Sequence, residues 1–132
     1  MPEDPTWLDR AIVEALHVDQ ILEHGGSLGI RDEGLLESAL ARPRQTWHYE
    51  PLTDLATLAA AYAFGVARNH PFVDGNKRTA LVAAYTFLAI NGFELEAPEP
   101  EAVSAILGTA DGSLSEEDLA SWIRSHLIGW VD

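Results

Sequence analysis

The chain has 132 residues, 47% of them hydrophobic and 22% charged, a composition that excludes a disordered protein and indicates one globular domain over residues 1–132. Eight basic residues against 21 acidic ones give a net charge of -13, which argues against direct nucleic-acid binding, since phosphate backbones bind through Lys and Arg. There are no cysteines, so disulfides and thiolate metal sites are excluded.

The first residues, MPEDPTWLDR, are acidic and lack the basic-then-apolar order of a signal peptide. No apolar run approaches the length needed to span a membrane. We therefore expect a soluble, cytoplasmic protein with no membrane partner.

Apolar residues recur at helical spacing, and no run alternates strictly enough to predict a strand, so we expect an all-α fold of about six helices. The first helix is predicted over residues 8–22, with Thr6 as its cap and Gly25-Gly26 at its end. Asp32 is expected to cap a second helix, which Pro43 stops. The segment 43–54, PRQTWHYEPLTD, has no helical period and is predicted to be an exposed loop.

Asp54 opens the third predicted helix, which runs to about Asn69 and whose small residues at 59–61, 63 and 65 would let a neighbouring helix approach closely. The fourth begins near Asn76 and ends at Asn91-Gly92. Because it is apolar almost all round, it should be central and buried. A fifth helix is built on Val103, Ile106 and Leu107. A last helix opens at Ser115 and contains Leu119, Trp122, Ile123 and Leu127.

The segment HPFVDGNKRTA, residues 70–80, lies directly before and at the start of the fourth predicted helix. The first turn of a helix has unpaired backbone N–H groups and the positive end of the helix dipole, so it stabilises an anion. Gly75 leaves no side chain in the way, Asn76 adds an amide donor, and Lys77 and Arg78 add charged donors. The pattern indicates a phosphate site.

Two further side chains supply what transfer of a phosphoryl or nucleotidyl group requires. Asp74 offers the hard oxygen ligand that Mg²⁺ uses together with substrate phosphates. His70 can accept a proton near neutral pH, for example from an attacking hydroxyl. Each residue alone has a structural interpretation as a cap, turn or solvated charge, but the set at this spacing favours function. Phe72 is interpreted as an aromatic anchor of the loop. His17 and His24 lack a third ligand, so a zinc site is not expected.

The segment resembles the Fic superfamily signature His-x-Phe-x-(Asp or Glu)-(Gly or Ala)-Asn-x-Arg, matched by residues 70–78. Within that superfamily, the chain is similar to the death-on-curing (Doc) branch, the toxins of bacterial and phage toxin–antitoxin pairs. The similarity rests on Lys77, on the block HGGSLGIRDEGLLESALARP from His24 to Pro43, and on the short chain. The resemblance spans roughly Leu16 to Glu94. It implies an all-α single-domain bundle with a central buried helix after the motif loop.

The resemblance also implies roles for the site residues. His70 would be the general base, Asp74 the Mg²⁺ ligand, and Gly75, Asn76, Lys77 and Arg78 the groups that bind ATP phosphates. The segment Trp47, His48 and Tyr49 would lie where Fic proteins carry a flap that aligns the target, although Trp47 is equally compatible with packing on the surface.

Adenylyl-transferring Fic proteins have a glycine in place of Lys77 and a second arginine at the position of Leu81. The resemblance therefore favours γ-phosphoryl transfer to a translation factor, which we expect to be an elongation factor, with arrest of translation. Adenylyl transfer is the alternative, and a catalytically silent binding module is a third. No internal inhibitory pattern is present, which implies restraint by a separate antitoxin protein.

Overall fold

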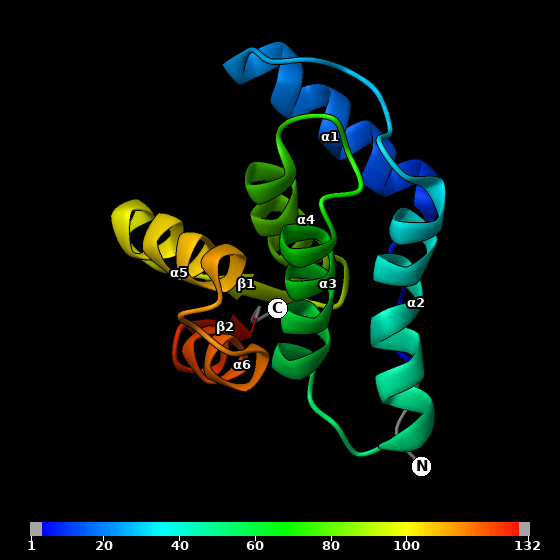
Figure 1. Ribbon diagram of the computed structural model, residues 1–132. Coiled ribbons are helices and arrows are strands. Elements are labelled where there is room, and N and C mark those ends of the chain that lie inside the picture. Colours follow the sequence, from blue (N-terminus) through cyan, green and yellow to red (C-terminus); the bar gives the residue numbers. More distant parts are fainter. Residues whose placement is uncertain (1–3, 130–132) are drawn as a thin grey trace.

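A computed structural model describes residues 4–129, in which the six expected helices are present. Two antiparallel helices, α3 (Leu55–Asn69) and α4 (Asn76–Ile90), lie at the centre. In Figure 1, α1 (Arg10–His24) lies above them, α2 (Glu33–Tyr49) to one side, and α5 (Glu99–Asp111) and α6 (Glu116–Ser125) to the other. The prediction of an all-α bundle is confirmed.

The helix starts follow from short polar side chains that bind the free N–H groups of the first turn. Asp32, Asp54 and Ser115 cap α2, α3 and α6 as predicted, each accepting from the N–H three residues ahead. The expectation of Thr6 as the first cap is wrong. Asp9 caps α1 by accepting from the Ile12 N–H at 2.9 Å, while the Thr6 N–H donates to the side chain of Asn91.

The core is built on α3 and α4, as the burial of Tyr62, Phe87 and Leu88 shows. The predicted helix after the motif, α4, shares the centre with α3, which is buried along more of its length. A β-carbon on Gly65 would lie 3.0 Å from the Cα of Ala39, so α2 and α3 approach closely at that point. The small residues of α3 therefore serve helix packing, as predicted.

The prediction that Pro43 ends the second helix is wrong, because α2 continues through it to Tyr49. A proline inside a helix removes one backbone hydrogen bond and costs about 3 kcal/mol. The Pro43 ring is buried and Trp47, one turn later, packs against the core, so burial offsets that cost. The expected loop over residues 43–54 is thus reduced to residues 50–54.

A short two-stranded antiparallel sheet was not expected from the sequence. Strand β1 (Phe93–Leu95) pairs with β2 (Leu127–Gly129), with Glu94 opposite Ile128. Leu127, predicted in the last helix, belongs to β2 because α6 ends at Ser125. Strands of three residues are too short to show a repeating pattern, and their pairing holds β2 beside β1, which itself packs against α4.

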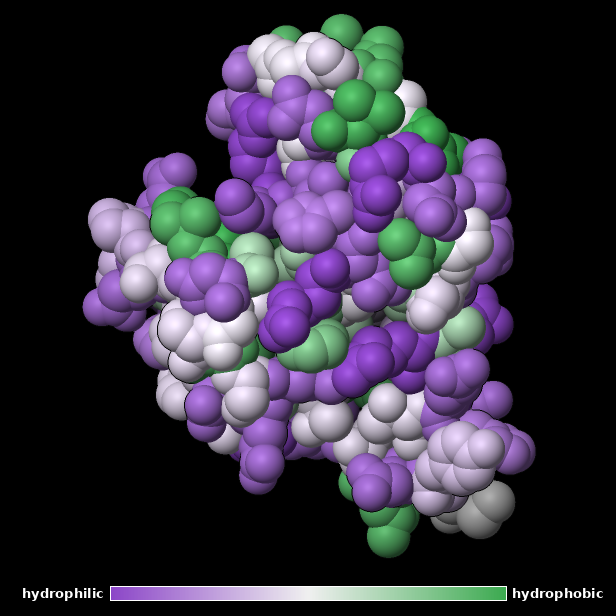
Figure 2. All heavy atoms as spheres, viewed as in Figure 1, coloured by the Kyte–Doolittle hydropathy of each residue, from purple (hydrophilic) through white to green (hydrophobic). Residues whose placement is uncertain are grey.

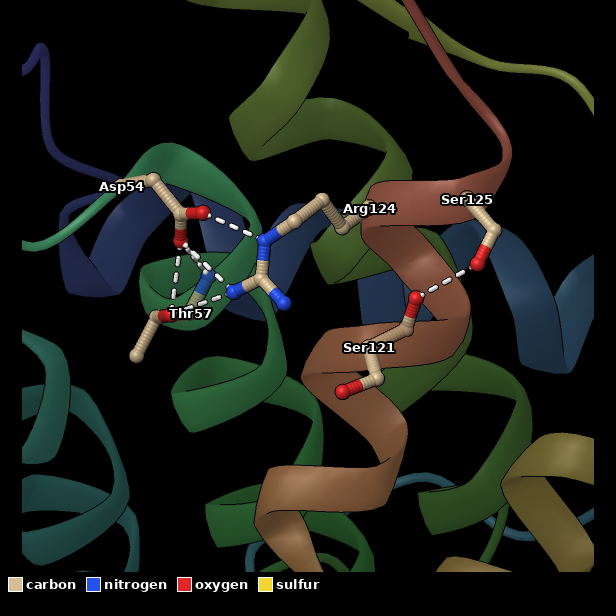
Figure 3. A network of polar contacts seen from close by, with 5 residues as sticks. All are labelled: Asp54, Thr57, Ser121, Arg124 and Ser125. Atoms are coloured by element: carbon tan, nitrogen blue, oxygen red, sulfur yellow. Dashed lines mark hydrogen bonds and ion pairs between the residues drawn. The ribbon is translucent and has the colours of Figure 1, made fainter.

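The lower end of α3 is joined to α6 by a network of polar side chains (Figure 3). Arg124 donates to Asp54 at 2.6 Å and 3.2 Å and to the Thr57 hydroxyl at 3.2 Å. The Arg124 guanidinium is the main cause that lowers the pKa of Asp54 to about 2.

Within residues 4–129, no helix is both long and apolar enough to cross a membrane.

Candidate active site

The site begins at His70, where α3 ends. His70 is the C-cap of α3 and has left-handed backbone angles, φ 50° and ψ 55°. Among residues 4–129 it is the one non-glycine residue with a positive φ. Its own N–H still donates to the Val66 carbonyl at 3.3 Å, so the chain turns sharply without losing the last helical bond. The turn leaves the His70 side chain exposed at a pocket.

The loop between α3 and α4 is braced by the side chain of Asn76. Its Oδ1 accepts from the Phe72 N–H and its Nδ2 donates to the Phe72 carbonyl, both at 2.9 Å. Phe72 is almost fully buried, as its predicted anchoring role requires. The amide of Asn76 was expected to bind phosphate, but here it holds the loop. Asn76 can still offer its backbone N–H to an anion, since it is the first residue of α4.

Gly75 gives α4 an N-terminus without a side-chain cap. It has φ 76° and makes no side-chain cap hydrogen bond, so the first-turn N–H groups of α4 are available to a ligand. Lys77 and Arg78 follow in the same turn and line the pocket. Arg78 also donates to the Gly25 carbonyl at 3.2 Å, which ties α4 to the end of α1.

Asp74 is an exposed carboxylate that two backbone N–H groups orient. The Ser27 N–H donates to Oδ2 at 3.2 Å and the Gly75 N–H donates to Oδ1 at 2.8 Å. These two hydrogen bonds lower the pKa of Asp74, and the bond from Ser27 has the larger effect. The side chain is therefore ionised at neutral pH. Each oxygen keeps a lone pair free.

A single carboxylate is enough for the Mg²⁺ ion that the resemblance described above implies. Within residues 4–129, no group of three or more His, Asp or Glu side chains could hold a metal ion. Mg²⁺ in phosphate-transferring sites is usually held by one or two carboxylates together with substrate phosphates and water. The donor set around Asp74 therefore fits an ion that arrives with a nucleotide and does not fit a resident all-protein metal centre.

The pocket has a volume of about 480 Å³ and two chemically different walls. One wall is the motif from His70 to Arg78, and the other is apolar and comes from α4 and α5. Its residues are Leu81, Val103, Ile106 and Leu107. A charged group can bind the first wall while an apolar or aromatic group packs against the second.

The segment between α1 and α2, residues 25–32, lies along the motif loop. Ile30 forms an isolated antiparallel bridge with Phe72, and the Val73 N–H donates to the Gly29 carbonyl at 3.0 Å. At Gly26, with φ 123°, a β-carbon would lie 2.6 Å from Oδ2 of Asp74. This segment therefore determines where the Asp74 carboxylate can lie.

His17 of α1 is a site residue that the sequence interpretation missed. Its Nε2–H donates to the Asp74 carbonyl at 2.8 Å, and its ring stacks on Phe72 with centroids 3.9 Å apart. His17 is buried with Val13 and Ile21, four residues away on either side. That spacing was the one available signal, since it places His17 on the inward face of α1.

The predicted flap residues do not line the pocket. Trp47, His48 and Tyr49 form the last turn of α2, where the Trp47 indole donates to Asp4 at 3.2 Å and the Tyr49 side chain is 80% exposed. The expectation of a loop there is wrong because α2 continues past Pro43. Their role toward a target stays a prediction.

The comparisons with known proteins agree with this geometry. A family model described as the Fic/DOC family matches residues 7–88, which contain α1, α2, α3 and most of α4. "Protein kinase doc" of Escherichia phage P1 is 38% identical over 110 residues, which cover 83% of this chain and 86% of that protein. "Toxin Doc" of Mycolicibacterium smegmatis is 53% identical over 74 residues, 55% of this chain and 57% of that protein.

The matched region contains every motif residue as well as His17 and the segment beside the loop. The apolar wall from α5 lies beyond it. The chain belongs to the Fic/DOC family and, within the Fic superfamily, to the Doc family.

Proposed function

We propose that this chain is a cytoplasmic toxin that transfers the γ-phosphoryl group of Mg-ATP to a hydroxyl of a protein target. The observation that carries the proposal is the pocket in which His70, Asp74 and the N-terminus of α4 with Lys77 and Arg78 converge. Two relatives support it by their names, one a protein kinase and the other a toxin.

Each side chain has a separate task in this reaction. The His70 imidazole accepts the proton of the target hydroxyl, whose oxygen forms a bond to the γ-phosphorus. The bond from that phosphorus to the bridging oxygen breaks, and ADP leaves with the electron pair. The first-turn N–H groups, Lys77 and Arg78 bind the phosphate oxygens. Mg²⁺, held by Asp74 and the phosphates, would neutralise charge on the leaving group.

Leu81 favours phosphoryl over adenylyl transfer. It lines the pocket at the position where adenylyl-transferring relatives of the superfamily carry a second arginine, so the wall there is apolar. One fewer arginine side chain is therefore available to bind phosphate, and the nucleotide is free to lie with its γ-phosphate toward His70. By its membership of the Doc family, we propose a translation elongation factor as the target, with arrest of translation as the consequence.

A separate antitoxin protein is proposed to restrain the activity. Exposed apolar side chains lie on α1 and the segment after it, Leu22 and Leu28, and among the residues that line the pocket, Val73, Val103 and Leu107. Figure 2 shows apolar atoms over α1 and its following loop and over α5, with hydrophilic atoms between them. A basic, amphipathic segment would complement these patches and the net charge of -13. Co-expression with the cognate antitoxin should restore growth, and continued arrest would refute this restraint.

The test is incubation of the purified chain with bacterial extract and ATP labelled at either the α- or the γ-phosphate. We expect protein labelling from the γ position alone, lost in His70→Ala and Asp74→Ala. His24→Ala is the matched control, since it removes an exposed histidine that does not line the pocket. Label from the α position would establish adenylyl transfer instead. No label, with no heat on calorimetric titration of Mg-ATP, would indicate a silent binding module.

A further inference from the structure

The backbone of His70 sets the direction in which its side chain leaves the main chain. Within residues 4–129, its imidazole makes no hydrogen bond, which leaves both ring nitrogens free for a substrate. With no side-chain partner, the region that the ring can reach depends on the direction of the Cα–Cβ bond, which the left-handed φ and ψ determine. That conformation is unfavourable for a residue with a β-carbon and persists only where neighbouring groups impose it.

Arg31 supplies the contacts that impose it. Its Nε–H donates to the His70 carbonyl at 2.7 Å, and its Nη2–H donates to the Asn69 carbonyl at 2.9 Å. The Arg31 backbone N–H donates to the Pro71 carbonyl at 2.7 Å. One residue thus binds three consecutive carbonyls, those directly before, at and after the turn.

The guanidinium suits this position because two of its N–H groups lie in one plane at a fixed spacing. Carbonyls at the end of a helix have no intrahelical partner, and the charge of arginine is stabilised by the negative end of the helix dipole. The Arg31 side chain lies outside the signature and outside the pocket lining, so it does not touch the nucleotide directly.

We propose that Arg31 is a positioning residue, which holds the backbone of His70 in the left-handed conformation and thereby directs the imidazole toward the target hydroxyl. The inference rests on the proposed function, because it assigns Arg31 a task in the same transfer reaction. It predicts that loss of Arg31 lowers the rate of transfer while leaving nucleotide binding intact.

The kinetic test compares Arg31→Ala, Arg31→Lys and the control Arg10→Ala. Arg10 is an arginine whose partners are side chains of α1 and α2, away from the pocket. We expect Arg31→Ala to lower kcat for γ-label transfer about 10- to 100-fold with the KM for ATP within about twofold of wild type. Arg31→Lys should recover part of the rate, and Arg10→Ala should keep it. A wild-type rate in Arg31→Ala, or an equal loss of ATP binding and turnover, would overturn the proposal.

Two measurements separate this inference from the proposed function. In a His70→Ala background, which has no base to direct, Arg31→Ala should cause no further loss of rate; an additive loss would contradict the mechanism. The second is the NMR resonances of the His70 ring, assigned with His70→Ala, which should shift in Arg31→Ala and not in Arg10→Ala. If the wild type transfers no label, this readout still decides whether Arg31 positions His70, and an unmoved resonance refutes it.

Discussion

The two ends of α3 carry comparable sets of polar residues and use them in opposite ways. At the N-terminal end, Asp54 and Thr57 bind Arg124 of α6, so that each charged side chain has a protein partner (Figure 3). At the C-terminal end, the contacts are made to backbone carbonyls, and the side chain of His70 is left unpaired. One end therefore stabilises the fold, whereas the other leaves the proposed base without a partner, at some cost in stability.

Replacing His70 by glycine should have the largest effect, because it should change activity and stability in opposite directions. The change removes the proposed base, and we expect γ-phosphoryl transfer to fall by about 100-fold or more. It also removes the β-carbon from a left-handed residue, which should raise the free energy of unfolding by about 1 kcal/mol. Transfer assays and urea denaturation check the two effects. A variant that is both inactive and less stable would contradict the view that this turn is strained.

Arg78→Lys should reduce transfer by about tenfold, because a point charge cannot reproduce a planar contact through two donors to a phosphate. The loss is expected in the KM for ATP as well as in kcat, in contrast to the Arg31 variants. Steady-state kinetics with varied ATP measures it. Lys77→Arg is the matched control, since it keeps a cation in the same helical turn. Normal kinetics in Arg78→Lys would make Arg78 a structural link to Gly25 only.

His17→Phe tests the support beneath Asp74. Phenylalanine can still stack on Phe72 but cannot donate to the Asp74 carbonyl, so one partly buried hydrogen bond is lost. We expect the free energy of unfolding to fall by about 1 to 2 kcal/mol and Mg-ATP to bind more weakly. Chemical denaturation and calorimetry report the two quantities. His126→Phe, a change of the same type at the end of α6, should leave nucleotide binding unaltered.

Arg124→Ala should have the smallest effect. Since both side chains of the Asp54 pair are about half exposed, its loss should lower the free energy of unfolding by less than about 1 kcal/mol and leave transfer unchanged. The pKa of Asp54 is lowered to about 2, so its contribution is complete above the ordinary value near 3.8 and disappears as the pH falls through about 2. Denaturation midpoints of wild type and variant should therefore converge between pH 4 and pH 2. A difference that is as large at pH 2 as at neutral pH would exclude this pair as its source.

Local rules were enough to predict most of the fold. The caps Asp32, Asp54 and Ser115 act on residues three positions away, and the periodicity of α3 and α4 is a property of each segment alone. The failures have tertiary causes. Nothing near Pro43 in the sequence shows that its ring is buried, and the β1–β2 pair joins residues that lie more than thirty positions apart.

The candidate site likewise divides into features that are local in the sequence and features that depend on tertiary contacts. The motif from His70 to Arg78 is contiguous and could be identified from its residues, whereas its supports could not. His17 binds a carbonyl 57 positions ahead, and Arg31 binds one 39 positions ahead. Such contacts depend on how α1 and the segment after it lie against the loop. The sequence also does not show which partner a polar side chain will choose: the Asn76 amide was expected to bind phosphate, but in the structure it binds the backbone of Phe72.

The close approach of Gly26 to Asp74 has a consequence for cells that produce this protein without restraint. Any larger residue at position 26 would collide with the carboxylate and would need an unfavourable φ. Survivors selected from a growing culture should therefore include spontaneous substitutions at codon 26, outside the signature, beside those in codons 70 and 74. Sequencing such survivors would map the boundaries of the working site by genetics alone.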